Sequence, residues 1–592
     1  MHPLAGKLLR GSRYAPAAFA LAAHLAGCAG ATAVHHPGAA LAARADSVLS
    51  RYEMYGLSGS VLVAHDGRTV LERGYGLADR RTGTPAAGDT RYDVASITKT
   101  FTAAAILRLA ERGLLSPRDP ISRFLGPVPA DKEAVTVHHL LTHTAGFPLD
   151  PADAGITPAH TRAEFTARAL AAPLRSPPGA EHRYSNLGYG LLAIVVERAS
   201  GRSFHEFVTS ELLGPAGLRA TELLGDADLP TGPAYATGYL PGREDTLVAQ
   251  PAVPRGGAES PSWGKHPMGA VGVVSTVGDL HRWLVALTGG RVLPDSLVRV
   301  MFTPYHGDEA YGWHVGTAPG VGRRVYRGGL RSGFAGLVSR YPDHGVTVVY
   351  LLNQATGWES VLRRDLERVA AGEPVPLPPP VVRLAPAALA ALAGDYRFPG
   401  GARIRVWEEG GVLIAGAEGQ TAASALSHPD VAAAPGHGAL NDLAARVVAA
   451  AVQESPADSA LARVDSAAAL AAWLRQRTGP APAAAAVLGT VPHPSGEGRA
   501  QTFVRLAPGG SVVRLIWQSG QVIAWGDGIR LPGLDRYRPT SASSAVAFRP
   551  REGVLRTLEF ELDAAGAPRG VRVRWPGGEA SALATRVESA HP

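Results

Sequence analysis

The feature that most constrains this chain is a serine placed three residues before a lysine, Ser96-Ile97-Thr98-Lys99, at the head of a long apolar segment. Lysine is scarce, because arginine supplies almost all of the 58 basic residues. Arginine keeps its proton in proteins, whereas a buried lysine can release it. Positions i and i+3 share one face of a helix, which brings the Lys99 amine to the Ser96 hydroxyl. The pattern predicts an activated serine nucleophile.

The residues behind this tetrad predict a buried helix. Apolar side chains recur up to Gly113, at Phe101, Ala104, Ile106, Leu107, Leu109 and Ala110. A lysine on such a helix must be paired or neutral. The simpler alternative is a serine at the start of a helix, followed by a lysine whose stem lies along apolar surface.

Length and composition limit the classes of protein to consider. A chain of 592 residues is too long for one hydrophobic core, and 46% hydrophobic with 18% charged residues is typical of folded domains. The formal charge of +7 is spread thinly, without a basic stripe interleaved with aromatic residues. We therefore expect no nucleic-acid partner.

The N-terminal residues have the pattern of an export signal. Lys7, Arg10 and Arg13 precede an apolar stretch that is too short to cross a bilayer and ends in Leu25-Ala26-Gly27-Cys28. This ending holds the only cysteine of the chain and resembles a bacterial lipobox. The resemblance predicts a lipoprotein signal peptide over 1–27, a lipid on Cys28, and a location on the periplasmic side of a bacterial membrane, with Ala29 favouring the outer membrane. An ordinary cleavable signal is the alternative.

Composition shifts divide the remaining chain into four parts. We expect a tether of small residues at 28–43, a mixed α/β unit at 44–371, a stiff Pro-rich linker at 372–387, and a β-rich domain at 388–592. The α/β unit opens with a predicted helix and hairpin and closes with predicted strands, at 42–55, 59–72, 336–341 and 346–352. Strands that flank a helical middle predict an α-β sandwich whose sheet joins both ends of the unit.

The C-terminal part has recurring strand candidates separated by turn signals. They lie at 395–398, 403–407, 412–415, 511–517, 521–525, 555–562 and 571–575. The spacing predicts a β-rich domain, a sandwich or a barrel, with a helical insertion at about 440–477. Its sequence contains no recognisable catalytic constellation.

A second motif, Tyr184-Ser185-Asn186, precedes another apolar helical segment. A phenol beside a serine–lysine pair can carry the proton from the nucleophile to the leaving group. An asparagine two residues further on can hold Lys99 and a substrate amide carbonyl. Taken alone, the tripeptide also fits a loop whose asparagine caps a helix.

Together these motifs resemble the serine β-lactamase/DD-peptidase superfamily, most closely its class C-like branch of penicillin-binding-protein-related hydrolases, over about residues 44–370. Four phrases follow the family order: 94–102, 137–147, 184–192 and 271–280. The resemblance implies an α+β fold in which an antiparallel sheet flanked by helices meets a helical subdomain, with the site between them.

The resemblance also implies the chemistry. Ser96 would attack a carbonyl and form an acyl-enzyme that water then cleaves, with Lys99 and Tyr184 sharing the acid and base work. Implied substrates are D-amino-acid peptides of the cell wall, small esters or β-lactams, and no cofactor is implied. The histidines of the second phrase, His138, His139 and His143, are scaffold in the family, so we expect no metal.

The third family motif departs from its pattern. The family has Lys or His, then any residue, then Gly, on a strand that edges the site, whereas this chain has Tyr326-Arg327-Gly328-Gly329. One register puts Tyr326 in the Lys/His place and the other puts Arg327 there. In both, the glycines let a substrate lie against the strand, and a backbone N–H near Gly329 could complete an oxyanion hole with that of Ser96. Arg327 or Arg331 could still bind a substrate carboxylate with two parallel hydrogen bonds.

The altered third motif leaves a second interpretation, a degenerate member that binds wall peptides or a protein partner without turnover. The intact Ser96, Lys99, Tyr184 and Asn186 favour a hydrolase. Other hydrolase classes lack support, because the sequence has neither a Gly-x-Ser-x-Gly elbow nor a His-Glu-x-x-His zinc motif.

Overall fold

The structure is a computed structural model. It describes residues 37–156, 161–224, 233–241, 247–249, 269–331, 333–354, 356–418, 438–452, 459, 461–464, 470–471, 474, 486–492, 499–505, 512–518, 521–529, 535–549, 554–574 and 580–587. The predicted signal peptide and Cys28 lie outside these residues.

Helix α1 (Pro37–Glu53) includes the end of the expected tether, 28–43. Those residues are helical because proline suits the first position of a helix and because Leu41 and Ala45 bury their side chains against the sheet.

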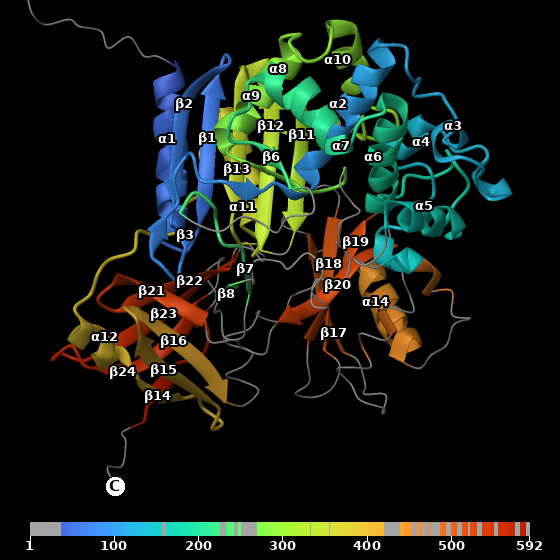
Figure 1. Ribbon diagram of the computed structural model, residues 1–592. Helices are drawn as coiled ribbons and strands as arrows, with labels where there is room; N and C mark the ends of the chain where they lie inside the picture. Colours follow the sequence, from blue (N-terminus) through green and yellow to red (C-terminus); the bar gives the residue numbers. More distant parts are fainter. Residues whose placement is uncertain are drawn as a thin grey trace, which may run out of the picture.

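A six-stranded antiparallel sheet forms the centre of the α/β unit (Figure 1). Its order is β10-β11-β12-β13-β1-β2. The strands are β10 (His314–Ala318), β11 (Gly322–Arg331), β12 (Phe334–Tyr341), β13 (Val346–Leu352), β1 (Gly59–His65) and β2 (Arg68–Tyr75). The predicted first and last strands are neighbours, since β1 pairs with β13 from Gly59↔Leu352 to His65↔Val346. The expected joining of the sheet by both ends of the unit is confirmed.

The two faces of this sheet bury different helices. Side chains alternate along each strand, so Leu62 joins one apolar cluster while Val61 and Val63 join the other. Helices α1 and α11 (Trp358–Ala370) cover the face of Val61 and Val63. Helices α2 (Thr98–Glu111) and α9 (Val277–Thr288) cover the face of Leu62. The result is the predicted α-β sandwich.

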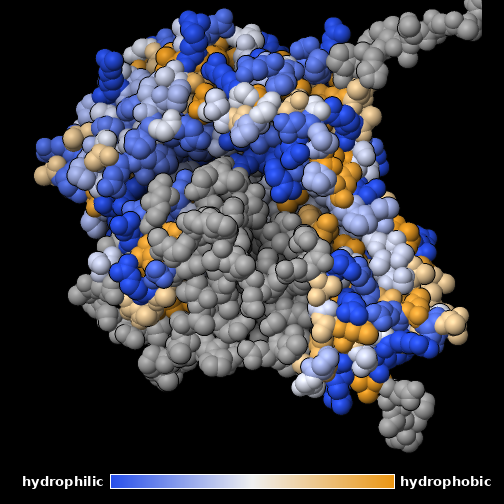
Figure 2. All heavy atoms as spheres, turned by 180° about the vertical axis from the view of Figure 1, so that it is seen from behind, coloured by the Kyte–Doolittle hydropathy of each residue, from blue (hydrophilic) through white to orange (hydrophobic). Residues whose placement is uncertain are grey.

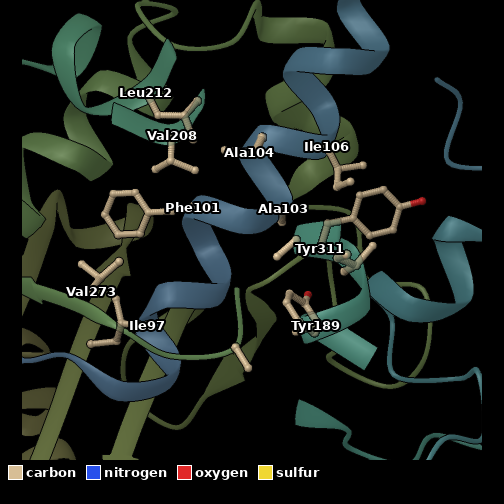
Figure 3. Packing of buried hydrophobic residues seen from close by; sticks show 14 of the residues in the cluster. Ile97, Phe101, Ala103, Ala104, Ile106, Tyr189, Val208, Leu212, Val273 and Tyr311 are labelled. Carbon is tan, nitrogen blue, oxygen red and sulfur yellow. The ribbon is translucent and has the colours of Figure 1, made fainter. Parts of the chain in front are cut away.

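Helix α2 is buried on almost all sides, as its apolar sequence predicts. Figure 3 shows Phe101, Ala103, Ala104 and Ile106 of α2 among apolar side chains of the neighbouring helices. The ring of Phe101 stacks on Trp283 of α9 with 4.3 Å between ring centroids. The helical subdomain beside α2 contains α3 (Ser122–Leu125), α4 (Val137–Leu141), α5 (Arg162–Ala171), α6 (Asn186–Ser200) and α7 (Phe204–Val208). This packing fixes the start of α2 between the sheet and the subdomain.

The C-terminal part contains a closed eight-stranded barrel and a separate four-stranded sheet. The barrel strands are β14 (Gly394–Arg397), β15 (Arg403–Glu409), β16 (Val412–Glu418), β21 (Asp535–Ser541), β22 (Ser544–Arg549), β23 (Val554–Leu562), β24 (Pro568–Arg574) and β25 (Ala584–Arg586). Between β16 and β21 come α14 (Gly438–Val452), β17 (Ala486–Pro492), β18 (Arg499–Arg505), β19 (Val512–Gln518) and β20 (Gln521–Ile529). The strands predicted at 511–525 therefore belong to an inserted sheet and not to the barrel.

The barrel packs against the helices on the outer face of the α/β unit. Phe548 of β22 stacks on Tyr52 of α1, with 5.7 Å between ring centroids and 4° between the ring planes, and lies 5.2 Å from the ring of Trp358 in α11. Along the linker, the Tyr55 hydroxyl donates to the Pro379 carbonyl at 2.9 Å and the Val382 N–H donates to the Pro539 carbonyl at 2.8 Å. An apolar interface thus joins the barrel to α1 and α11.

Figure 2 shows the molecule from behind, where hydrophilic side chains predominate over the α/β unit and apolar ones are scattered among them. In the described part of the chain, no helix combines the length and the apolar composition that crossing a bilayer requires.

Candidate active site

Ser96 sits in a tight turn immediately before α2. It is the middle residue of the 3-10 turn η1 (Ala95–Ile97), and Ala95 has a left-handed backbone with a φ of +49°. Such a conformation costs a non-glycine residue about 1 kcal/mol or more and persists only where its surroundings enforce it. Asp93 does so here, because one carboxylate oxygen accepts from the Ala95 N–H at 2.8 Å and the other from Arg331 Nη1 at 2.8 Å. The turn therefore presents Ser96 in a fixed direction.

Lys99 lies one turn into α2 and points its amine back at Ser96. The Nζ atom is 3.1 Å from Ser96 Oγ, 2.8 Å from Asn186 Oδ1 and 2.9 Å from the Ala270 carbonyl oxygen. The side chain is fully buried. Burial lowers the pKa of Lys99 to about 8, with Tyr184 opposing the shift and the charge of Arg327 adding to it. The predicted Ser–Lys pair is thus within hydrogen-bond distance inside the protein.

Tyr184 reaches Ser96 from the other side. Its hydroxyl donates to Ser96 Oγ at 2.9 Å and accepts from Arg327 Nη2 at 3.0 Å. Burial alone would raise the pKa of Tyr184, but the positive charges of Lys99 and Arg327 together lower it. The next residue, Ser185, caps α6 by accepting from the Gly188 N–H at 2.9 Å, which fixes where the helix begins and so where Tyr184 stands.

Asn186 is held in one orientation by two different partners. Its Oδ1 accepts from Lys99, and its Nδ2 donates to Asp150 Oδ1 at 2.8 Å. A carboxylate can only accept, so the amide nitrogen must face Asp150. Asp150 is half-buried, and burial raises its pKa despite the hydrogen bond from Asn186. The carboxylate of Asp150 therefore stands next to the Asn186 amide, which the sequence pattern predicts to hold Lys99 and a substrate carbonyl.

The structure places Arg327, and not Tyr326, at the site. Arg327 Nε donates to the Ser96 carbonyl at 3.3 Å, in addition to its contact with Tyr184. Neighbouring residues of a strand point to opposite faces, and Tyr326 instead bonds to Asp308 at 3.1 Å and stacks on His314. Gly329 lies against the nucleophile turn, whereas a Cβ on Gly328 would meet nothing nearer than 3.8 Å.

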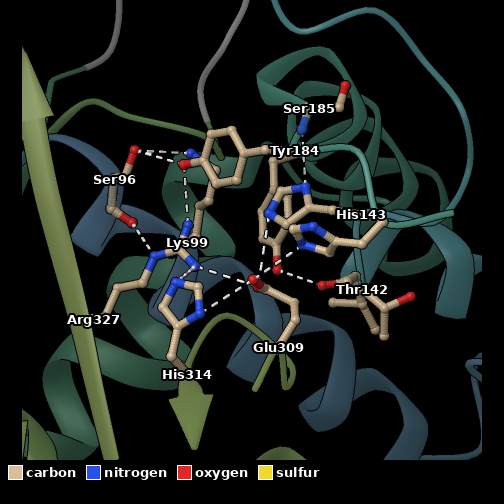
Figure 4. A network of polar contacts seen from close by, with 12 residues as sticks. Ser96, Lys99, Thr142, His143, Tyr184, Ser185, Glu309, His314 and Arg327 are labelled. Carbon is tan, nitrogen blue, oxygen red and sulfur yellow. Dashed lines mark hydrogen bonds and ion pairs between the residues drawn. The ribbon is translucent and has the colours of Figure 1, made fainter. Parts of the chain in front are cut away.

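A buried carboxylate, Glu309, accompanies Arg327 (Figure 4). Glu309 Oε1 lies 3.4 Å from Arg327 Nη1, and its Oε2 lies 3.4 Å from His182 Nε2 and 3.3 Å from His314 Nδ1. Burial would raise the pKa of Glu309, but His314, His182 and Arg327 together lower it. The carboxylate is therefore ionised and neutralises the arginine beside it.

The three histidines of the second phrase have separate partners. His138 Nδ1 bonds to the Tyr311 hydroxyl at 2.7 Å, and His139 completes the cap of α4. His143 packs its ring 4.3 Å from that of Tyr184, and burial lowers the pKa of His143 well below its usual range. Among the described residues, no group of three or more His, Cys, Asp or Glu side chains is arranged to hold a metal ion.

The structure brings together most of the residues that the sequence singled out. Ser96, Lys99, Tyr184, Asn186, Arg327 and Gly329 converge, whereas Tyr326 and Gly328 make no contact with Ser96. Sequence reasoning missed Asp93, Asp150, the Ala270 carbonyl and Glu309. Asp150, the Ala270 carbonyl and Glu309 belong to no spaced pattern and contribute through long-range contacts. Asp93 bonds locally to the Ala95 N–H, so the Asp two residues before Ala95 was a turn signal that could have identified it.

Comparison with known proteins finds relatives of the α/β unit. The Beta-lactamase family model matches residues 32–373, more than half of the chain. Penicillin-binding protein 4* of Bacillus subtilis (strain 168) is 28% identical over 345 residues, covering 55% of this chain and 75% of that protein. Protein flp of Staphylococcus aureus (strain MW2) is 32% identical over 168 residues, 27% of this chain and 34% of its own length. A solved penicillin binding protein from Bacillus halodurans superposes with a TM-score of 0.47 and 28% identity, over 54% of this chain and 98% of that one.

Proposed function

The chain belongs to the beta-lactamase family of serine hydrolases, and from this premise we propose that it cleaves an ester or amide bond through an acyl-enzyme on Ser96. One observation carries the proposal: the Lys99 amine at 3.1 Å and the Tyr184 hydroxyl at 2.9 Å both reach Ser96 Oγ. An alcohol is a weak nucleophile until a neighbouring group takes its proton, and here two such groups touch it.

We assign the first proton transfer to Tyr184. With a pKa of about 8, Lys99 is mostly protonated at neutral pH, and its three acceptors match the three N–H bonds of an ammonium group. Tyr184 lies between Lys99 and Arg327, whose charges favour its phenolate. In this assignment Tyr184 accepts the proton of Ser96 while Oγ forms a bond to the substrate carbonyl carbon.

The later steps follow from the same geometry. Tyr184 gives its proton to the leaving group as the bond to the carbonyl carbon breaks, which leaves an ester on Ser96. A water molecule then gives a proton to Tyr184, attacks the ester carbon, and releases the acid while Ser96 regains its proton. The close approach of Gly329 to the Ser96 backbone nitrogen supports an oxyanion site between these two segments.

The proposal covers small esters, D-amino-acid peptides and β-lactams. Penicillin-binding protein 4* of Bacillus subtilis is named for a β-lactam ligand, so a penicillin is a suitable first probe of acylation. The alternative is a binding protein for wall peptides or a protein partner, for which acylation is not needed.

The test compares Ser96→Ala with Ser200→Ala, a serine at the C-terminal end of α6. We expect the Ser96 variant to lose hydrolysis of a chromogenic ester, and the Ser200 variant to retain it. Intact-mass measurement after treatment with a penicillin or a fluorophosphonate should show one added group in the native chain and none in Ser96→Ala. Turnover by folded Ser96→Ala would refute the proposal, and failure of every acylating probe on the native chain would favour the binding protein.

We also propose that Cys28 carries a lipid that anchors the protein on the periplasmic side of a bacterial membrane. The support is the sequence Leu25-Ala26-Gly27-Cys28 directly after an apolar stretch. Expressed in a host that processes lipoproteins, the native chain should take up a labelled fatty acid and sediment with the outer membrane. A Cys28→Ala variant that still does both would contradict the anchor.

A further inference from the structure

Both arginines of the third motif are already paired with buried acids. Arg327 contacts Glu309 at 3.4 Å with the two side chains 2% and 1% exposed, and Arg331 contacts Asp93 at 2.8 Å with 12% and 7% exposed. Each positive charge therefore has a carboxylate beside it before any substrate enters. An arginine neutralised in this way attracts a second carboxylate only weakly.

The hydrogen bonds of Arg327 are also taken. Its Nε donates to the Ser96 carbonyl, its Nη2 to the Tyr184 hydroxyl, and its Nη1 faces Glu309. Recognition of a carboxylate by arginine uses two neighbouring N–H groups that point the same way. Nη1 also lies 3.4 Å from His314 Nε2, so four of the five N–H groups of Arg327 face a protein partner and no pair of neighbouring donors is left for a substrate carboxylate.

A further acid, Asp150, stands next to Asn186, the partner of Lys99. Asp150 accepts from Asn186, which in turn accepts from Lys99, so its carboxylate lies close to the catalytic amine. Lys99 itself donates its three N–H bonds to Ser96 Oγ, Asn186 Oδ1 and the Ala270 carbonyl oxygen. An anionic group near the reacting bond would meet the field of Asp150, and no N–H bond of Lys99 would be left to bind it.

We propose that the site selects esters and amides that carry no carboxylate next to the scissile bond, and that Glu309 is a residue that determines this specificity. The inference rests on the proposed function, because it concerns the leaving group that Tyr184 protonates beside Arg327. Neutral or cationic leaving groups fit these surroundings. β-Lactams and peptides with a terminal carboxylate, whose anionic group lies near the cleaved bond, acylate Ser96 more slowly than their uncharged counterparts.

The experiment uses a matched set of esters with the full-length chain. Phenyl acetate, 3-carbamoylphenyl acetate and 3-carboxyphenyl acetate share one acyl group and differ in the charge of the leaving group. After correction for spontaneous hydrolysis, we expect kcat/KM for the carbamoyl ester to exceed that for the carboxylate by about tenfold or more. In Glu309→Gln, which frees the charge of Arg327, this ratio should fall by about tenfold.

Two further variants complete the design. Glu561→Gln removes the acid of an exposed Glu–Arg pair in the barrel and should leave the ratio unchanged. Asp150→Asn provides a test at a half-buried position if Glu309→Gln does not fold, and should also lower the ratio. A native chain that prefers the carboxylated ester, or acid-to-amide variants that fold and leave the ratio unchanged, would overturn the inference while the hydrolase stands. Failure of all three esters, of the penicillin and of the fluorophosphonate to modify Ser96 would instead refute the proposed function and the inference with it.

Discussion

Gly329 lies against the backbone of Ser96, so closely that a Cβ atom on the glycine would come within 3.1 Å of the serine nitrogen and 2.3 Å of the Val94 carbonyl oxygen. The strand and the nucleophile turn can approach in this way only because Gly329 has no side chain. This contact fixes the position of β11 relative to the Ser96 backbone nitrogen, the proposed oxyanion donor.

Replacement of Gly329 by alanine should therefore separate the strand from the turn. We expect Gly329→Ala to lower kcat/KM for a chromogenic ester by about 100-fold or more, since one misplaced oxyanion donor costs that much. The matched control is Gly328→Ala, whose Cβ has its nearest neighbour, the Gly336 carbonyl oxygen, at 3.8 Å. Equal losses in the two variants would show that the close contact with Ser96 has no part in catalysis.

The pH dependence of kcat/KM should show which group loses its proton. If Lys99 acts as an ammonium group, activity falls as pH rises through about 8, the pKa that burial gives this lysine, because the cation beside Tyr184 is lost. At lower pH, activity falls as the phenolate of Tyr184 takes up a proton. A kcat/KM that keeps rising between pH 8 and 9.5 would instead make the neutral amine of Lys99 the base.

Removal of the phenol should affect the chemical step strongly. Tyr184→Phe deletes the group that accepts the Ser96 proton and leaves Arg327 Nη2 without its acceptor. We expect kcat to fall by about 1000-fold, within the range that general acid–base groups contribute. The control is Tyr305→Phe, at a tyrosine that is 39% exposed. Nearly native turnover in Tyr184→Phe would assign the proton transfer to Lys99 alone.

The interface between the barrel and the α/β unit allows a stability test. Phe548→Ala removes the ring that stacks on Tyr52 and packs on Trp358. We expect a loss of about 2–3 kcal/mol in the free energy of unfolding, since a large apolar side chain leaves a cavity. Scanning calorimetry should record a lower transition temperature while ester hydrolysis at 25 °C stays native. An unchanged transition would mean that the barrel and the α/β unit do not stabilise each other through this ring.

Local patterns were sufficient to predict the framework of the α/β unit. Alternating apolar residues and turn signals predict the hairpin at 59–72 and the strands at 336–352. In the structure these segments are β1, β2, β12 and β13. The contact of Ser96 with Lys99 follows from the i, i+3 spacing alone. The position of Tyr184 needed the resemblance to a family, since nothing in its neighbourhood specifies a partner distant in the sequence.

Properties that depend on long-range contacts were not predictable in the same way. Two registers of the third motif differ by one residue, and such a shift exchanges the faces of a strand, so only packing decides between Tyr326 and Arg327. Glu309 lies between α10 (Asp295–Met301) and β10, and its partner Arg327 comes from β11. In the C-terminal domain, Leu413 of β16 pairs with Tyr537 of β21 across a long insertion, which strand patterns cannot indicate.

The pairing of β1 with β13 means that the chain enters and leaves the central sheet of the α/β unit at neighbouring points. The linker at 372–387 is therefore a junction where evolution or an engineer can exchange the appended domain without breaking any hydrogen bond of the six-stranded sheet. Any replacement domain must supply an apolar cover for α1 and α11.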